Sequence, residues 1–307
     1  MTSLFVIKQS TGRPGMARRL LLIIGAVVAA SGVAMLPAVG VALAYGEGEP
    51  ALQILGASFV TIAVGFLAWR VFGQTGELTT REGFAAVGLA WFVMSAFGTL
   101  PFLFTDSIPN FFDAYFETAS GFTTTGASIV ADPSALSKGV LFWRSTTQWI
   151  GGMGVIVLSI AILPLLGVGG VQLARAESPG PTPDRLTPRF QETAKRLWLV
   201  YVGLTAVQIL FLWVGDMDFF QSVNHAMTTL STGGFGTEAT SITNFSAYTQ
   251  WVITVFMFIA GVSFALHFRA LRDPKAYFGS AEFALYSAFF LGAVVIIGGG
   301  LIGPGVQ

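Results

Sequence analysis

The sequence predicts an all-α integral membrane protein, and three observations lead to that fold class. Of its 307 residues, 53% are apolar and only 10% are charged, whereas ordinary soluble domains carry about 25% charged residues. Seven apolar runs are long enough to cross a bilayer as helices, which takes about 20 residues. Between these runs, two stretches repeat one pattern of a short helix followed by a glycine-containing loop.

The composition also excludes several classes of function. The chain has no Cys, which rules out disulfides, Cys-ligated zinc, iron–sulfur clusters and cysteine nucleophiles. It has only two His, too few for a His-based metal cage. Its 16 basic and 16 acidic residues balance, so the net charge gives no sign of a nucleic-acid partner. We expect membrane lipid as the surrounding medium and no nucleic acid as a partner.

The seven apolar runs also define an orientation. They cover 20–45, 51–70, 83–105, 140–167, 197–215, 247–268 and 281–303. The first run is too long for the core of a signal peptide, so we expect it to remain as a helix. With the N-terminus inside, 14 of the 16 Lys and Arg residues fall on the inner side, as the positive-inside rule requires. Only Lys138 and Arg144 lie outside or near the outer face, and we predict a cytoplasmic N-terminus.

Two outer connections, 106–139 and 216–246, are too long and too apolar to be ordinary loops. They align with each other at an offset of 108 residues. The equivalent residues include Phe111 and Phe219, Phe112 and Phe220, Thr124 and Thr232, and Gly126 and Gly234. Glu117 and His225 are also equivalent, nine residues before the glycine in each copy. This internal repeat has the form span, short helix, glycine-containing loop, span.

The short helices predicted over 111–122 and 219–230 would each be about 18 Å long. That length is too short to cross the bilayer, so we expect each to enter the membrane from outside and turn back. Non-helical backbone at membrane depth is tolerated only where it is buried in protein or lines a water-filled cavity. A glycine-containing loop after such a half-helix therefore favours a pore.

The loops carry suitable chemistry for a cation filter. Backbone carbonyls replace the water around a cation without adding net charge, and glycine reaches the backbone angles that such a loop needs. The C-terminal end of each half-helix is negative and favours cations. The candidate filter residues are Thr124, Thr125, Gly126, Thr232, Gly233 and Gly234. The alternative is an ordinary turn, because small residues also mark helix packing in membranes.

Three further polar residues have two interpretations each. Glu117 and His225 either fix the filter through hydrogen bonds behind it or face an outer vestibule. Arg144 either pairs with an acidic neighbour such as Glu117 or Asp113, or extends outward to water. The glycine-rich run 151–154 predicts a close approach between helices, with a hinge as the alternative.

At this point the residues match a known family. The motifs are Phe122-Thr-Thr-Thr-Gly-Ala-Ser128, Phe142-Trp-Arg-Ser-Thr-Thr-Gln-Trp-Ile-Gly-Gly-Met-Gly154, Ala161-Ile-Leu-Pro-Leu-Leu-Gly-Val-Gly-Gly170, Arg175-Ala-Glu-Ser-Pro-Gly180 and Ser231-Thr-Gly-Gly-Phe235. Over nearly its whole length the chain resembles the Trk/Ktr/HKT superfamily of potassium transporters, and most closely its TrkH type. The resemblance implies potassium uptake across the bacterial or archaeal inner membrane, with K+ as the transported ion and no organic cofactor. It also implies a homodimer and a cytosolic nucleotide-binding subunit that gates the pore.

The resemblance also implies a domain organisation resembling a potassium channel. Two N-terminal helices precede repeated helix–pore loop–helix units, of which two are complete and a third begins. The expected parts are 1–80 for the two-helix region, 81–170 for the first unit, 171–196 for a cytoplasmic linker, 197–272 for the second unit, and 273–307 for the first helix of the third. The family uses four units, so we expect either a truncated chain or two copies that combine.

Other functions compete with potassium uptake. An intramembrane hydrolase would use Ser120, Ser128 or Ser231 with His225, but the sequence has no nucleophile-elbow motif. We therefore expect no enzyme. A cation-coupled secondary transporter also uses broken helices and repeats, although no span carries an acidic residue at its centre. A fourth alternative is that this stretch of chain is inactive alone.

Overall fold

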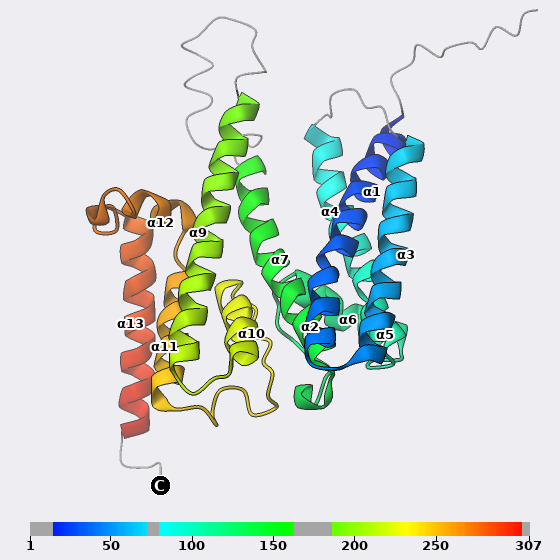
Figure 1. Ribbon diagram of the computed structural model, residues 1–307. Coiled ribbons are helices and arrows are strands. Elements are labelled where there is room, and N and C mark those ends of the chain that lie inside the picture. The colour runs from blue at the N-terminus through cyan, green and yellow to red at the C-terminus, as the bar shows by residue number, and fades with distance from the viewer. Residues whose placement is uncertain (1–14, 73–79, 163–185, 303–307) are drawn as a thin grey trace, which may run out of the picture. The chain divides into compact units, whose positions relative to one another are not determined.

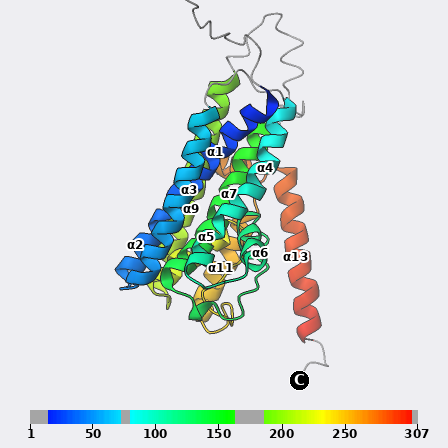
Figure 2. The same cartoon turned by 90° about the vertical axis from the view of Figure 1, so that its right-hand side faces the viewer.

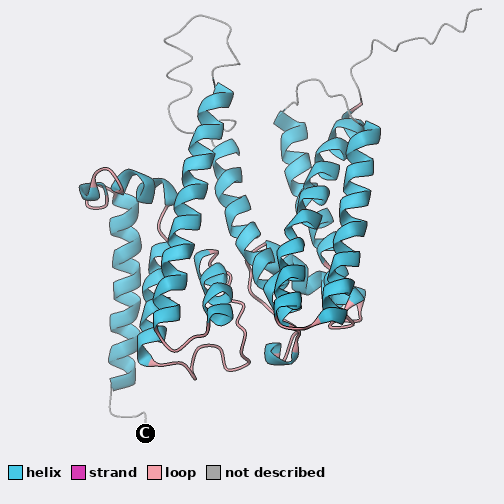
Figure 3. Ribbon diagram, in the orientation of Figure 1, coloured by secondary structure: helices cyan, strands magenta, loops and turns pink. Residues whose placement is uncertain are grey.

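The structure is a computed structural model, and it describes residues 15–72, 80–162 and 186–302. Across the described ranges the regular elements are helices and no strand is present (Figure 3). The predicted all-α class is therefore confirmed for this part of the chain. The basic segment 1–14, most of the linker 171–196, and the ends of the runs 140–167 and 281–303 lie outside the described residues.

The apolar runs form helices of membrane-spanning length. Among the described residues, five segments are long and apolar enough to cross a bilayer: Met16–Ala44, Gly48–Phe72, Glu82–Phe104, Glu192–Val214 and Ala281–Gly299. A sixth candidate is the pair Ala247–Ala260 and Phe264–Ala270, which bends by 98° at its break. These six coincide with six of the seven predicted runs. The remaining run, 140–167, is helical over Lys138–Ile162, and 163–167 lie outside the described residues.

The chain divides into two compact units. Unit 1 consists of residues 1–123 and 127–147, and unit 2 consists of residues 124–126 and 148–307. The three residues 124–126 therefore group with the second unit, although they follow a helix of the first.

Unit 1 is a bundle of helices from the first half of the chain. It contains α1 (Met16–Ala34), α2 (Leu36–Ala44), α3 (Gly48–Phe72), α4 (Thr80–Gly98), α5 (Leu100–Phe104), α6 (Phe111–Phe122), the 3-10 helix η1 (Pro133–Ala135) and the first part of α7 (Lys138–Ile162). Helices α1 and α3 run side by side (Figures 1 and 2). The Ser58 hydroxyl of α3 donates to the Gly32 carbonyl of α1 at 2.8 Å.

Two carboxylates, Glu82 and the half-buried Glu47, connect distant parts of unit 1. Glu82 of α4 forms an ion pair with Arg19 of α1. Glu47, in the turn between α2 and α3, accepts hydrogen bonds from the backbone N–H groups of Lys138 (2.8 Å) and Gly139 (3.1 Å). These N–H groups open α7 and have no partner within the helix, so the carboxylate serves as its cap. The N-terminal helices thereby hold the start of α7.

Unit 2 contains the remainder of α7 together with the later helices. These are α9 (Leu186–Val214), α10 (Phe219–Leu230), α11 (Ala247–Ala260), α12 (Phe264–Ala270), the 3-10 helix η3 (Pro274–Ala276) and α13 (Ala281–Ile302). A core cluster of Tyr201, Leu230, Phe256 and Ala260 joins α9, α10 and α11. The Tyr201 ring stacks on Trp149 of α7 at 5.6 Å, and its hydroxyl donates to the Trp149 carbonyl at 3.0 Å.

The sixth predicted run is not a straight span, because α11 ends at Ala260 and α12 begins at Phe264 after a sharp bend. His267 bridges the bend. Its Nε2 lies 2.9 Å from the Ile259 carbonyl oxygen, and its Nδ1 lies 2.8 Å from the Tyr277 hydroxyl. A carbonyl only accepts, so Nε2 carries the proton of this bond. The ring thus supplies a second donor to the Ile259 carbonyl in the last turn of α11, which also accepts from the Val262 N–H at 3.1 Å.

Asp216 closes the turn between α9 and α10 and makes the fold sensitive to acid. Hydrogen bonds from the Thr249 hydroxyl, and then from the backbone and hydroxyl of Ser246, hold the pKa of Asp216 below its usual range. A lowered folded-state pKa stabilises the fold above the unfolded pKa of about 4, and this contribution is lost as pH falls through the folded value. We expect the melting temperature of wild type to fall more steeply than that of Asp216→Asn as the pH falls below about 5. Parallel acid profiles, measured by thermal unfolding in detergent, would contradict this role.

Candidate functional site

Two matched half-length helices lead into the candidate site. Helices α6 and α10 each have 12 residues and begin 108 positions apart. Each is capped by the residue before it: Asn110 accepts from the Phe112 N–H at 2.8 Å, and Asp218 accepts from the Gln221 N–H at 2.7 Å. The short helices predicted over 111–122 and 219–230 are therefore confirmed at both boundaries.

The loops after the two helices share an unusual backbone conformation. Thr124 has φ +54° and Gly126 has φ +76°, while Thr232 has φ +58° and Gly234 has φ +82°. Glycine adopts such angles freely, but a β-branched residue at positive φ is rare and strained. Strain of this kind persists only where the surrounding structure imposes it, and it gathers at functional sites. The same strained pattern occurs at equivalent positions of the two repeats.

The two loops meet inside unit 2. A Cβ atom built on Gly126 would overlap the carbonyl oxygen of Gly233. Residues 124–126 and 232–234 both belong to this unit. The structure therefore brings together the two segments that contain the six candidate filter residues. The contact is possible only because position 126 has no side chain.

A cavity of about 410 Å3 adjoins the second loop. Thr232, Gly233 and Gly234 line it, together with the threonines Thr228 and Thr229 of α10. A Cβ built on Gly234 would meet no atom within 4 Å, so this glycine faces open space. The loop therefore offers backbone and hydroxyl oxygens beside a cavity rather than a packed core.

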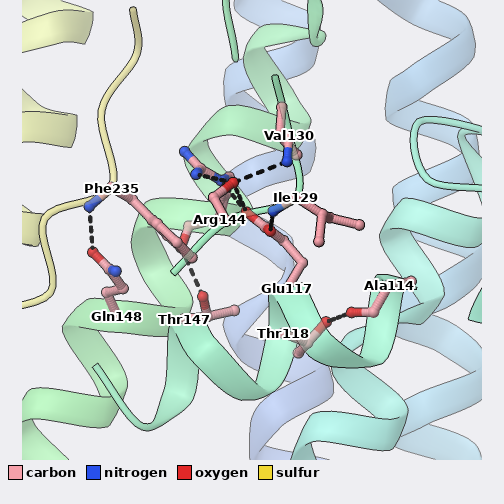
Figure 4. Close-up of polar contacts among 10 residues, drawn as sticks. Ala114, Glu117, Thr118, Ile129, Val130, Arg144, Thr147, Gln148 and Phe235 are labelled. Atoms are coloured by element: carbon pink, nitrogen blue, oxygen red, sulfur yellow. Dashed lines mark hydrogen bonds and ion pairs between the residues drawn. The ribbon is translucent and has the colours of Figure 1, made fainter. Parts of the chain in front are cut away.

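In unit 1, a buried ion pair fixes the chain that leaves the first loop. Arg144 Nε of α7 lies 2.6 Å from Glu117 Oε1 of α6, and both side chains are buried. Glu117 also accepts from the Ser128 hydroxyl at 2.9 Å and from the Ile129 N–H at 3.0 Å (Figure 4). The Ser128 hydroxyl in turn accepts from Arg144 Nη2 and from the Val130 N–H, both at 3.0 Å. Of the two acidic partners predicted for Arg144, Glu117 is the one it binds.

In the second repeat, the positions equivalent to Glu117 and Ile129 are also joined by a hydrogen bond, but without an ion pair. His225 Nε2 lies 3.2 Å from the Thr237 hydroxyl. These residues stand nine before and three after the loop glycine, as Glu117 and Ile129 do in the first repeat. The position equivalent to the arginine is occupied by Val252. Glu117 and His225 therefore each bind the chain beyond their own loop, which supports the interpretation that they fix it.

Helix α7 also contacts the second loop directly. Gln148 is fully buried, and its Oε1 accepts from the backbone N–H of Phe235 at 3.1 Å (Figure 4). One turn further on, a Cβ built on Gly152 would lie 2.8 Å from Ser231 Cβ and 2.9 Å from the Tyr201 hydroxyl. The glycine therefore permits the close approach of α7 to the end of α10 that the run 151–154 predicts.

Comparison with known proteins decides the family. The TrkH profile, described as a cation transport protein, matches residues 51–283 of the chain. The chain belongs to the TrkH family. The match covers most of the described residues and includes both loops.

Several relatives are similar to this TrkH-family chain. The Trk system potassium uptake protein TrkH of Escherichia coli strain K12 is 44% identical over 279 residues, which cover 88% of this chain and 57% of the relative. The protein of the same name from Halomonas elongata is 38% identical over 288 residues, which cover 91% of this chain and 59% of the relative. The crystal structure of the potassium transporter TrkH from Vibrio parahaemolyticus matches with a TM-score of 0.80 at 36% identity. The match covers 92% of this chain and 58% of the transporter chain. The chain thus spans somewhat more than half the length of these relatives.

The family assignment and the apolar helices make the TrkH-family chain a multi-pass membrane protein. Sequence reasoning identified Glu117, Arg144 and the two loops, but it gave Gln148 no role. One signal was available, because Gln148 lies four residues after Arg144 and hence on the same face of an apolar helix. A fully buried amide on that face is unusual enough to need a partner.

Proposed function

We propose that this chain forms part of a pore that takes up potassium across the cytoplasmic membrane. The observation that carries the proposal is the pair of matched loops. Each follows a half-length helix, each has Thr and Gly at positive φ two residues apart, and the two meet at Gly126 and Gly233. In the proposal, Thr124, Thr125, Gly126, Thr232, Gly233 and Gly234 form two segments of a potassium filter.

The chemistry of the loops supports this role. A potassium ion gives up its water only where a ring of oxygens replaces it, and backbone carbonyls do so without trapping the ion by charge. Residues at positive φ turn the peptide planes, so that carbonyls of neighbouring residues can face one side. Helices α6 and α10 end at the loops, where the negative ends of their dipoles favour a cation. The cavity beside Thr232–Gly234 gives an ion room to reach these oxygens.

A ring of oxygens needs more than the two segments present here. The relatives are called potassium uptake proteins, and this chain spans 57% of the length of the one from Escherichia coli. We propose that two further segments complete the ring. They belong either to a longer chain of the relatives' length or to a second copy of this one.

The proposal extends to orientation and partners. The distribution of Lys and Arg favours a cytoplasmic N-terminus in the inner membrane. A homodimer gated by a cytosolic nucleotide-binding subunit rests on the family resemblance. Binding of the purified protein to such a subunit, with and without nucleotide, would test this part separately from transport.

The experiment that tests the proposal is potassium flux into liposomes. We would reconstitute the 307-residue chain, a longer chain with two further repeats, and the Gly126→Asp variant of each. Selective flux from the short chain, lost in the variant, would mean that copies combine. Flux from the longer chain alone would mean that one polypeptide supplies all segments and that the short chain is inactive by itself. If neither chain carried potassium with the nucleotide-binding subunit present, the proposal would be wrong.

A coupled transporter remains the second candidate because one span is broken. The 98° bend between α11 and α12 is a feature that secondary transporters also use near their binding sites. The same liposomes distinguish the two, since flux through a pore follows the potassium gradient alone. Flux that stops when a sodium or proton gradient is removed would favour coupling.

A further inference from the structure

Gln148 stands at the place where the two loops differ from each other. The first loop reads Thr-Thr-Gly over 124–126 and the second reads Thr-Gly-Gly over 232–234, so Gly233 is equivalent to Thr125. A Cβ built on Gly233 would overlap the carboxamide of Gln148 and stand 2.7 Å from its Nε2. Gly233 has no side chain, and the Gln148 side chain from α7 therefore occupies that space.

The same carboxamide is tied to the backbone beyond the loop. Its Oε1 accepts from the Phe235 N–H at 3.1 Å. Phe235 immediately follows Gly234, whose positive φ of +82° defines the loop. One amide thus contacts the residue before this glycine and hydrogen-bonds to the residue after it.

The other end of the amide faces the first loop. A Cβ built on Gly126 would lie 3.8 Å from Gln148 Nε2. This nitrogen is buried and has no acceptor among the described residues. Leaving a buried donor unpaired costs about 1–3 kcal/mol, and native proteins keep few such groups. An apolar side chain of the same size would avoid that cost.

The second repeat has no counterpart to this amide. The residue 108 positions after Gln148 is Phe256, which packs in the apolar cluster around Tyr201 and Leu230. Gln148 thus occurs in the first repeat only, and it contacts the loop of the second repeat.

We propose that Gln148 is a positioning residue that sets the distance between the two filter segments and thereby the size of the cation they accept. The proposal rests on the function proposed above. By filling the space at Gly233 and holding the Phe235 N–H, the carboxamide fixes the second segment. Because Gly126 lies against the Gly233 carbonyl, fixing the second segment also fixes where the first segment meets it. Selectivity between potassium and sodium depends on the placement of such oxygens.

A double-mutant cycle tests the spatial part of the proposal. Gly233→Ala alone is expected to reduce potassium flux about tenfold or more, because the new methyl group collides with the carboxamide. In a Gln148→Ala background the same Gly233→Ala change is expected to cost little, since the space is then free. Equal losses in both backgrounds would overturn the claim that Gln148 occupies the space at position 233.

A second variant tests the hydrogen bond. Gln148→Met keeps the length of the side chain but removes both polar atoms, and we expect the potassium-to-sodium permeability ratio to fall about tenfold. The matched control is Gln208→Met in α9, because Gln208 is also fully buried and its amide atoms have no partner among the described residues. Thermal unfolding in detergent measures any general loss of stability in both variants. An unchanged permeability ratio in Gln148→Met, or an equal fall in Gln208→Met, would overturn the positioning role.

The flux assays use whichever chain length carries potassium in the liposome experiment above. Flux in wild type with an unaltered ratio in Gln148→Met rejects only the role of Gln148. Absence of flux from wild type at both lengths rejects the proposed function, and the role of Gln148 with it. The two failures are therefore distinguishable.

Discussion

Replacing Gly126 with alanine is expected to lower potassium flux by about five- to a hundredfold. The new Cβ would overlap the Gly233 carbonyl oxygen, so one of the two loops would have to move. Overpacking of this kind costs about 1–3 kcal/mol, and each 1.4 kcal/mol is a factor of about ten in an equilibrium. The displaced atom is a proposed ligand of the ion, so the cost falls on ion binding. Potassium flux and the potassium-to-sodium ratio in liposomes measure it.

The chain contains a close control for this substitution. Gly46, in the turn between α2 and α3, also has φ +76°, but a Cβ built there would meet no atom within 4 Å. Gly46→Ala therefore carries the backbone strain of a positive φ without the collision. We expect Gly46→Ala to retain most of the wild-type flux. Equal losses in the two variants would show that strain alone, and not the contact between the loops, explains the effect at Gly126.

Replacing Arg144 with methionine is expected to destabilise the protein by about 3–5 kcal/mol, because it leaves the Glu117 carboxylate buried without its charged partner. Glu117 also holds Ser128 and Ile129, so the chain beyond the first loop would lose its anchor. Thermal or denaturant unfolding in detergent measures the change. The double variant Glu117→Met/Arg144→Met should be less damaging, since replacing a whole buried pair by apolar groups removes the uncompensated charge.

The control is an ion pair at the surface. Arg196 and Glu192 pair one turn apart on α9, with 41% and 61% of their side chains exposed. Pairs of this kind contribute about 0–1 kcal/mol, so Arg196→Met should leave stability almost unchanged. If Arg144→Met were as mild as Arg196→Met, the buried network would not be what fixes the chain after the first loop.

Local signals in the sequence were sufficient for much of the fold. The half-length helices begin where predicted because Asn110 and Asp218 are strong N-caps. The apolar runs predicted the spans because burial in lipid depends on composition and length. Breaks within spans were harder to see. Pro37 starts a new helix within the first run, and Gly261–Ser263 bend the sixth run through 98°.

The candidate site was predicted in its parts but not in its contacts. Alignment of the repeats pairs Gly126 with Gly234, since these occupy equivalent positions. In space Gly126 lies against Gly233 instead. Alignment shows which residues hold the same position within each copy of the repeat. It does not show which residues touch where the two copies meet, because the touching surfaces need not be equivalent. For the same reason no spacing in the sequence showed that Gln148 fills the space at Gly233.

The grouping of residues 124–126 with the second unit has a consequence for biogenesis. The first loop leaves the ribosome long before its partner, because Gly126 and Gly233 are separated by 233 − 126 = 107 positions. At about 5–20 residues per second, the interval is about 5–20 seconds. During that time the helices of the first unit can assemble, but the loop lacks the surface that imposes its strained conformation. Membrane insertion and formation of the loop pair are therefore separate events, and the second must wait for the synthesis of α10.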